Sequence, residues 1–238
     1  MTLSFGSCFA GIGTIDLGLE RAGMECKWQI EVDDYCRRVL AKHWPDVPRY
    51  GDIREVTELE TVDVVAGGFP CQATSQAAAR AERGAGWLWP EMLRVVGVVR
   101  PSFVVVENPE GLRHRGRGLG EVLSDLSAIG FDAEWATLRA SDFGAPHRRA
   151  RVWVVAYSNR DREPDLSLDA EASQLPSVRE AVRRWADPPR GLRVDDGPRA
   201  RVERLGNSAT PQVAEWVGAR IVEHARESAT PPSTKGRT

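Results

Sequence analysis

Two patterns of hydrophobic and polar residues alternate over the first two thirds of the chain. Short apolar runs of strand length occur at Leu3–Ser7, Lys27–Val32, Val62–Ala66, Phe103–Val106 and Arg151–Ala156. Segments with helical spacing of apolar residues lie between them, at Ile15–Gly23, Asp34–His43, Trp89–Val99 and Gly120–Ile129. Strands that alternate with amphipathic helices are typical of a sheet covered on both faces. The pattern therefore predicts an α/β fold with a doubly wound, mostly parallel sheet.

The pattern changes near Ser158. The residues that follow are polar, then rich in arginine and proline, and they show no sustained period. We interpret 158–202 as a small lobe inserted after a main domain that covers 1–157. A last helix is predicted at Pro211–Arg226, so that 203–227 returns to the main domain. The tail 228–238, SATPPSTKGRT, is predicted to be disordered.

Composition narrows the class of protein. The chain has 238 residues, 42% of them hydrophobic, which suffices for one core. Its net charge of -2 argues against a histone-like binder but allows a local basic face. We expect no signal peptide, and the sequence contains no apolar run of membrane-spanning length. The four cysteines form no CxxC pair and the four histidines are scattered, so neither a metal site nor disulfides are expected. We expect a reduced, cytoplasmic protein with no membrane partner.

A glycine-rich turn, FAGIG at Phe9–Gly13, joins the first predicted strand to its helix. Gly11 and Gly13 would let a ligand approach the backbone at a helix N-terminus. The dinucleotide fingerprint requires a third glycine where Asp16 stands, which disfavours an NAD-dependent oxidoreductase. A purely structural turn explains the two glycines about as well.

Acidic residues at two further strand ends favour the ligand interpretation. Glu31 lies about 20 residues after the turn, where an acid can hold ribose hydroxyls. The tripeptide GDI, which contains Asp52 and Ile53, places another acidic side chain at the end of a segment. Together these residues indicate a nucleoside-containing cofactor without a pyrophosphate, and S-adenosylmethionine fits that description.

Reactive side chains follow other buried strands. Cys71, in VAGGFPCQATS, lies just past an apolar run, whereas a structural cysteine would be expected within it. Glu107, in VVVENPEGL, ends another strand. Arg149 and Arg151 alternate into a strand, so they are predicted to point to the same side. A solvated loop acid and a basic edge strand are the ordinary alternatives for these groups.

The motifs taken together resemble the DNA cytosine-5 methyltransferases of the small bacterial or phage type. The resemblance is carried by FAGIG, EVD, GDI, GFPCQ, ENP, HRRARV and LGNSATPQVAEWVGARI, in the family's order. It covers roughly 1–157 and 203–225. The chain departs from the family at Ala73-Thr74-Ser75, where Pro-Phe-Ser is frequent, at Pro109, where valine is usual, and at His147, where glutamine is common.

The resemblance implies a Rossmann-like, S-adenosylmethionine-dependent fold and a role for each matched residue. Cys71 resembles the nucleophile that attacks cytosine C6, and Glu107 resembles the acid that hydrogen-bonds N3 and the amino group. Arg149 resembles the residue that holds the O2 atom of the base or supports the intermediate, with Arg151 as its partner. The cofactor site would be lined by Phe9, Gly11, Gly13, Glu31, Asp52, Ile53 and Pro70, and closed by Asn207 and Ser208.

The implied partner is double-stranded DNA, from which the target base must swing out. The short lobe at 158–202 can place few side chains on base edges, so we expect a target of about two to four base pairs. Between Arg179 and Arg204, arginines outnumber acids by eight to five, which suits either a DNA face or a solvated surface. We expect a monomer. The alternatives are the tRNA-methylating branch of the family and a non-catalytic DNA-binding relative.

Overall fold

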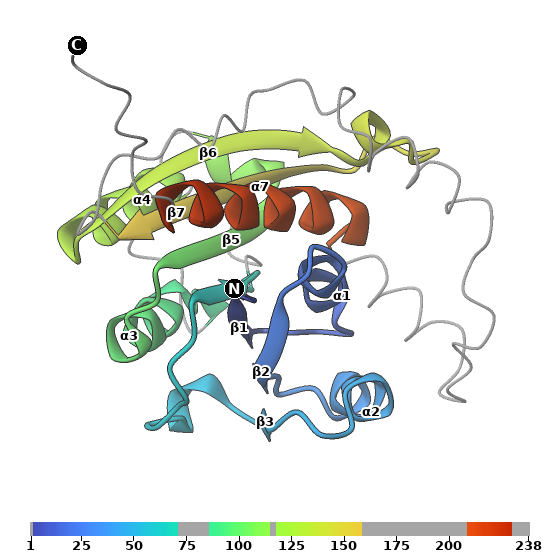
Figure 1. The fold of residues 1–238 in the computed structure, drawn as a ribbon, viewed down its shortest axis with the longest axis vertical. Coiled ribbons are helices and arrows are strands. Elements are labelled where there is room, and N and C mark those ends of the chain that lie inside the picture. Colours follow the sequence, from blue (N-terminus) through green and yellow to red (C-terminus); the bar gives the residue numbers. More distant parts are fainter. Residues whose placement is uncertain (1, 71–85, 115–117, 159–208, 230–238) are drawn as a thin grey trace, which may run out of the picture.

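The structure is a computed structural model that describes residues 2–70, 86–114, 118–158 and 209–229. Its centre is a seven-stranded sheet in the order β3-β2-β1-β4-β5-β7-β6 (Figure 1). The strands are β1 (Ser4–Cys8), β2 (Glu25–Ile30), β3 (Arg49–Tyr50), β4 (Val64–Gly67), β5 (Phe103–Pro109), β6 (Phe131–Arg139) and β7 (Ala150–Ser158). The first five run parallel, and β7 pairs antiparallel with both β5 and β6. The predicted mostly parallel sheet is confirmed.

Helices cover both faces of this sheet. The α-helices are α1 (Thr14–Arg21), α2 (Asp34–His43), α3 (Trp89–Val99), α4 (Leu119–Ala128) and α7 (Pro211–Ala229). The described residues also form the short 3-10 turns η1 (Ile53–Glu55), η5 (Glu110–Arg113) and η6 (Ala140–Phe143). One core joins α1, α2 and α7 to the sheet, and a second core joins α3 and α4 to its other face. None of these helices has the length and apolarity that a membrane span needs.

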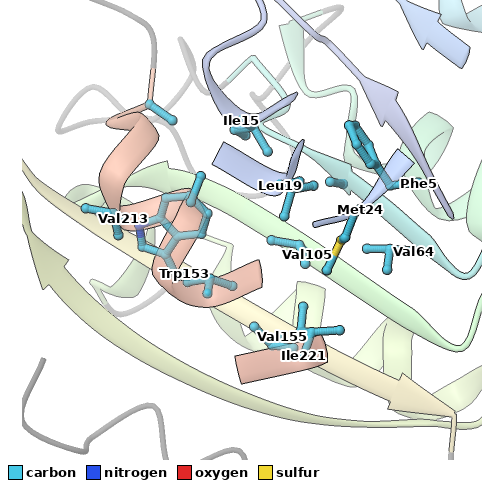
Figure 2. Close-up of a cluster of buried hydrophobic side chains, with 14 of the residues drawn as sticks. Phe5, Ile15, Leu19, Met24, Val64, Val105, Trp153, Val155, Val213 and Ile221 are labelled. Carbon is cyan, nitrogen blue, oxygen red and sulfur yellow. The ribbon is translucent and has the colours of Figure 1, made fainter. Parts of the chain in front are cut away.

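The core under α7 is shared by distant parts of the chain. Figure 2 shows Leu19 of α1, Ile221 of α7 and Trp153 of β7 converging on it. The two helices approach closely because glycines lie where they cross. A Cβ atom on Gly18 would lie 2.4 Å from the Cβ of Ala214, and one on Gly218 would lie 2.8 Å from the Cβ of Ala22. Burial against α7 therefore holds α1, and with it the turn that precedes α1.

Local signals fix the helix ends that the sequence predicts. Asp33 caps α2 by accepting a hydrogen bond from the Cys36 backbone N–H at 2.9 Å. Pro90 occupies the first turn of α3, where its missing N–H costs nothing. Both helices have the predicted bounds, whereas α7 extends past the predicted end at Arg226 to Ala229.

The sequence interpretation did not include β6, an edge strand whose Trp135 is 42% exposed. Apart from Ser158, which ends β7, the predicted lobe at 158–202 lies outside the described residues. The predicted disordered tail at 228–238 begins too early, because Ser228 and Ala229 still belong to α7, and its remainder lies outside the described residues. The division of the chain into domains thus stays a prediction.

Candidate active site

A cavity of about 580 Å³ opens at the carboxyl edge of the sheet. Its walls come from the turn after β1, the end of β2, the segment around η1, and the ends of β4 and β5. In the sheet, β2 and β3 lie on one side of β1, whereas β4 and β5 lie on its other side. The strand order therefore reverses at β1. Ligands of doubly wound sheets bind in the crevice at such a switch point. The cavity volume is also within the range of about 300–1,000 Å³ typical of small-molecule sites.

The glycine turn forms one wall in a conformation that only some residues tolerate. Gly11 and Gly13 have φ angles of 57° and 80°, and Phe9 has a φ of 54°. A non-glycine residue in the left-handed region is strained, and such strain is common at functional sites. Gly13 is also required by packing, because a Cβ atom there would lie 2.4 Å from the Trp44 ring.

Glu31 holds this turn against the end of β2. One of its carboxylate oxygens accepts a hydrogen bond from the Gly11 N–H at 2.7 Å, and the other accepts from the Asp33 N–H at 2.8 Å. Each carboxylate oxygen has two lone pairs, so the acid can still accept hydrogen bonds from a ligand. Glu31 therefore orders the wall of the cavity as well as lining it.

The segment around η1 is fixed by two arginines. Asp52 accepts a hydrogen bond from the Arg54 N–H at 3.0 Å and pairs with the guanidinium of Arg54. These contacts lower the pKa of Asp52 to about 2, so it is ionised at neutral pH. Arg94, on α3, donates to the carbonyl oxygens of Ile53 at 2.6 Å and Val56 at 2.8 Å.

Glu107 is the buried acid of the cavity, with 5% of its surface exposed. Burial raises its pKa to about 7, although the charges of Arg151 and Arg149 oppose this shift. Arg151 Nε lies 3.1 Å from Glu107 Oε1 as an ion pair. Glu107 therefore exchanges a proton near neutral pH, which is the property required of a general acid.

The structure corrects the geometry predicted for the two arginines. Arg151 lies in β7, but Arg149 precedes the strand and has a φ of 33°. Strand alternation therefore does not set its direction. Burial lowers the pKa of Arg149, and the charge of Arg151 lowers it further. Both arginines nevertheless act electrostatically on Glu107.

Asn108 is a cavity residue that the sequence analysis missed. Its side chain is 1% exposed, and neither its amide nitrogen nor its oxygen has a hydrogen-bond partner among the described residues. Buried polar atoms without partners are costly unless a ligand satisfies them. The sequence signal that could have identified Asn108 is its position in the ENP motif, directly after Glu107.

Pro70 lines the cavity as the last described residue before Cys71. Cys71 itself, Asn207 and Ser208 lie outside the described residues. Cys8 and Cys26 are buried in strands, and burial raises the pKa of both thiols, which disfavours the reactive thiolate. No group of side chains within the described ranges is arranged to hold a metal ion.

Comparison with known proteins decides the family. The family of C-5 cytosine-specific DNA methylases matches residues 3–196. The chain belongs to this family. Among curated members, it is 35% identical over 178 residues to the Type II methyltransferase M2.BsuMI of Bacillus subtilis (strain 168), covering 67% of this chain and 46% of the relative. It is 34% identical over 187 residues to the Type II methyltransferase M.BanI of Aneurinibacillus aneurinilyticus, covering 74% of this chain and 43% of the relative.

The methylase fold is shared with solved structures. The Dnmt2 methyltransferase of S. pombe superposes with a TM-score of 0.58 at 18% identity, over 71% of this chain and 53% of that one. The Entamoeba histolytica methyltransferase EhMeth gives 0.56 at 12% identity, over 69% and 55% of the two chains. This methylase chain spans about half the length of the curated relatives it matches.

Proposed function

We propose that this chain transfers a methyl group from S-adenosylmethionine to C5 of a cytosine in duplex DNA. The observation that carries the proposal is the position of Glu107. It is a buried acid with a pKa of about 7 that shares a cavity with Pro70, the residue before Cys71. The family and the Type II methyltransferases similar to this chain support DNA as the substrate.

The cavity suits the cofactor that the family implies. Gly11 carries no side chain that would cover this wall, and the Glu31 carboxylate keeps lone pairs for hydroxyl groups. S-adenosylmethionine supplies an electrophilic methyl group when it is bound. The cavity residues that would hold it are Phe9, Gly11, Glu31, Asp52, Ile53 and Pro70. Gly13, which packs against Trp44 behind the cavity wall, and Asn207 and Ser208 are added by family resemblance.

The chemistry assigned to the side chains follows from the low reactivity of cytosine C5. The Cys71 thiolate forms a bond to C6, and protonated Glu107 gives its proton to N3 as electron density moves onto the ring. C5 thereby becomes nucleophilic and accepts the methyl group. Loss of the C5 proton to solvent then re-forms the C5–C6 double bond and expels the thiolate, and the N3 proton returns to Glu107. Arg151 stabilises the Glu107 carboxylate once its proton has left, and Arg149 is assigned to the O2 atom of the base.

We infer that the chain acts as a monomer on a base flipped out of the duplex. The segment 158–202 is assigned to target recognition. Its length supports a target of about two to four base pairs, because each bidentate base contact contributes only ~1–3 kcal/mol of discrimination.

Expression in a methylation-free host, followed by bisulfite sequencing of the host DNA, tests this function. The expected result is 5-methylcytosine in one short sequence context, and none with Cys71→Ala. Folded, soluble protein that leaves the DNA unmodified would favour a non-catalytic relative. Purified protein given duplex DNA and tRNA together separates the two substrates, since preferential labelling of tRNA would contradict the proposal.

Trapping the covalent step tests the assignment of Cys71. Duplex DNA that contains 5-fluorocytosine, incubated with methyl donor, is expected to form an adduct that survives denaturant. Peptide mapping should place it on Cys71. Glu107→Gln is expected to slow adduct formation without removing the thiol. An adduct on another cysteine would overturn the assignment.

A further inference from the structure

A second hollow, of about 610 Å³, lies outside the catalytic cavity and has no role in the chemistry above. It is formed by the end of β6, by η6 and by the segment that leads into β7. Its polar lining consists of Arg139, Ser141, Asp142, His147 and Arg148, all of them exposed.

The strand register places this hollow at the same edge of the sheet as Glu107. Arg139, at the end of β6, pairs with Ala150 at the start of β7, and Arg151 pairs with Pro109 at the end of β5. Only β7 separates β6 from the strand that carries Glu107. Because neighbouring strands are ~4.8 Å apart, the end of β6 lies ~10 Å from the end of β5.

The hollow has an excess of positive charge that the described residues do not neutralise. Neither Arg139 nor Arg148 has an ion-pair partner within the part of the chain that the structure describes. Asp142 is the one carboxylate in the lining, and it accepts a hydrogen bond from the Ser141 hydroxyl at 3.4 Å. Guanidinium groups suit phosphate, because their planar forks match two of its oxygens.

The loop that forms the hollow is anchored. Phe143 is buried, and its ring packs edge-on against Trp216 of α7 at a centroid distance of 5.7 Å. The Ala145 N–H donates to the Ala140 carbonyl at 3.0 Å, and Gly144 turns the chain with a φ of 84°. A site on an anchored loop loses little conformational entropy on binding.

We propose that this hollow binds a backbone phosphate of the DNA that carries the target cytosine. The proposal rests on the proposed function and adds a contact that positions the duplex rather than reads its sequence. A strand of DNA advances ~3.4 Å per nucleotide, so a separation of ~10 Å corresponds to about three nucleotides from the flipped base.

Salt-dependent DNA binding tests the site. We would measure affinity by fluorescence anisotropy over a salt series for the wild type and for Arg139→Ala/Arg148→Ala. The double variant should bind about tenfold more weakly, and its plot of log affinity against log salt should be shallower by about 0.9 per phosphate lost. Its kcat at saturating DNA and its affinity for S-adenosylmethionine should stay within about twofold of wild type. Asp142→Asn should bind DNA more tightly, because it removes a carboxylate that repels phosphate.

Arg21→Ala provides the control, since Arg21 ends α1 and therefore lies toward the opposite edge of the sheet. Like each substitution of the double variant, it removes one positive charge, and it should leave the salt slope unchanged. A neutral methylphosphonate, moved along the DNA, should weaken wild-type binding when it lies two to four nucleotides from the cytosine but should leave binding by the double variant unaffected.

A wild-type salt slope in the double variant would overturn this inference while the proposed function stood. A wild type that neither binds nor methylates DNA would instead overturn the proposed function.

Discussion

Gly68 and Glu107 are in contact at the carboxyl edge of the sheet. A Cβ atom on Gly68 would lie 3.0 Å from Oε2 of Glu107 and 3.0 Å from its backbone carbonyl oxygen. The absence of a side chain at position 68 therefore lets the chain leaving β4 pass directly over the acid at the end of β5. This close approach brings the segment that leads to Cys71 next to the proposed proton donor.

Gly68→Ala is expected to displace the Glu107 carboxyl by a few tenths of an ångström. Because misplacing a reacting group by ~1 Å can cost about a hundredfold in rate, we expect kcat/KM to fall about tenfold. Steady-state methylation of a duplex oligonucleotide measures the effect. Gly97→Ala is the matched control, since nothing lies within 4 Å of a Cβ atom there. Wild-type activity in Gly68→Ala would show that the contact does not position the acid.

The pH dependence of activity should reveal the protonated form of Glu107. Burial raises its pKa to about 7, and the acid must carry its proton to serve N3. Activity is therefore expected below this pKa and should decline as pH rises through about 7. Arg151→Gln removes a charge that lowers the pKa of Glu107, so the decline in kcat/KM should move to higher pH.

Arg113→Gln serves as the control for this shift, because Arg113 pairs with Glu110 on η5 rather than with Glu107. It should leave the pH profile in place. A profile that is identical in the wild type and in Arg151→Gln would exclude Glu107 as the titrating group.

Glu31→Gln is expected to weaken binding of S-adenosylmethionine by about ten- to a hundredfold. The carboxylate accepts hydrogen bonds from two backbone N–H groups. A glutamine would replace one of these acceptors with an amide donor, so one N–H would lose its hydrogen bond. Isothermal titration calorimetry with the cofactor product measures the loss. Asp34→Asn removes an equal charge from an exposed side chain nearby and should bind normally. Equal weakening in both variants would indicate a general charge effect.

Asp16 should make the folded protein less stable as pH rises. It is fully buried and accepts hydrogen bonds from Ser7 Oγ at 3.0 Å and Gln29 Nε2 at 2.8 Å. Burial nevertheless raises its pKa from 3.8 to about 6. The folded state then holds a proton that the unfolded chain releases, so stability declines between about pH 4 and pH 6 and stays lower above that range.

Asp16→Asn should remove this decline, which amounts to on the order of 3 kcal/mol at about 1.4 kcal/mol per pKa unit. Urea unfolding at pH 4.5 and pH 7.5 should capture about 2 kcal/mol of this decline, because part of it lies below pH 4.5. The quantity compared is the difference between wild type and variant, which share any contribution from Glu107. The exposed Asp132→Asn should follow the wild type. A wild-type pH dependence in Asp16→Asn would show that Asp16 ionises freely in the fold.

Features with local causes could be predicted from the sequence. The bounds of α2 and α3 follow from Asp33 as a cap and from Pro90 in the first turn. The positions of Glu31 and Glu107 at strand ends could be predicted because each directly follows the apolar run of its strand. Features that depend on pairing could not be predicted in this way. The exposed Trp135 weakens the apolar pattern of β6, and the order that places β7 between β5 and β6 is set by the sheet as a whole.

The site shows the same division. Residue types and order indicated the cavity residues, but not that Glu31 ties down the glycine turn or that Gly68 touches Glu107. The prediction that Arg149 and Arg151 point to the same side assumed that both lie in a strand. It was wrong for Arg149, which precedes the strand and has a positive φ. In the sequence, Asp16 was noted only because it occupies the third glycine position of the dinucleotide fingerprint. Its burial depends on hydrogen bonds from Ser7 and Gln29, which lie on neighbouring strands.

The crossing of α1 and α7 has a consequence for biosynthesis. Until residues 211–229 leave the ribosome, Leu19 and Trp153 have no α7 to cover them, and the nascent chain exposes the part of this sheet face that α1 and α2 do not cover. Ala209, just before α7, also lines the catalytic cavity. Maturation of the cavity is thus coupled to completion of this late segment, and an incompletely translated copy would expose apolar surface to which chaperones bind.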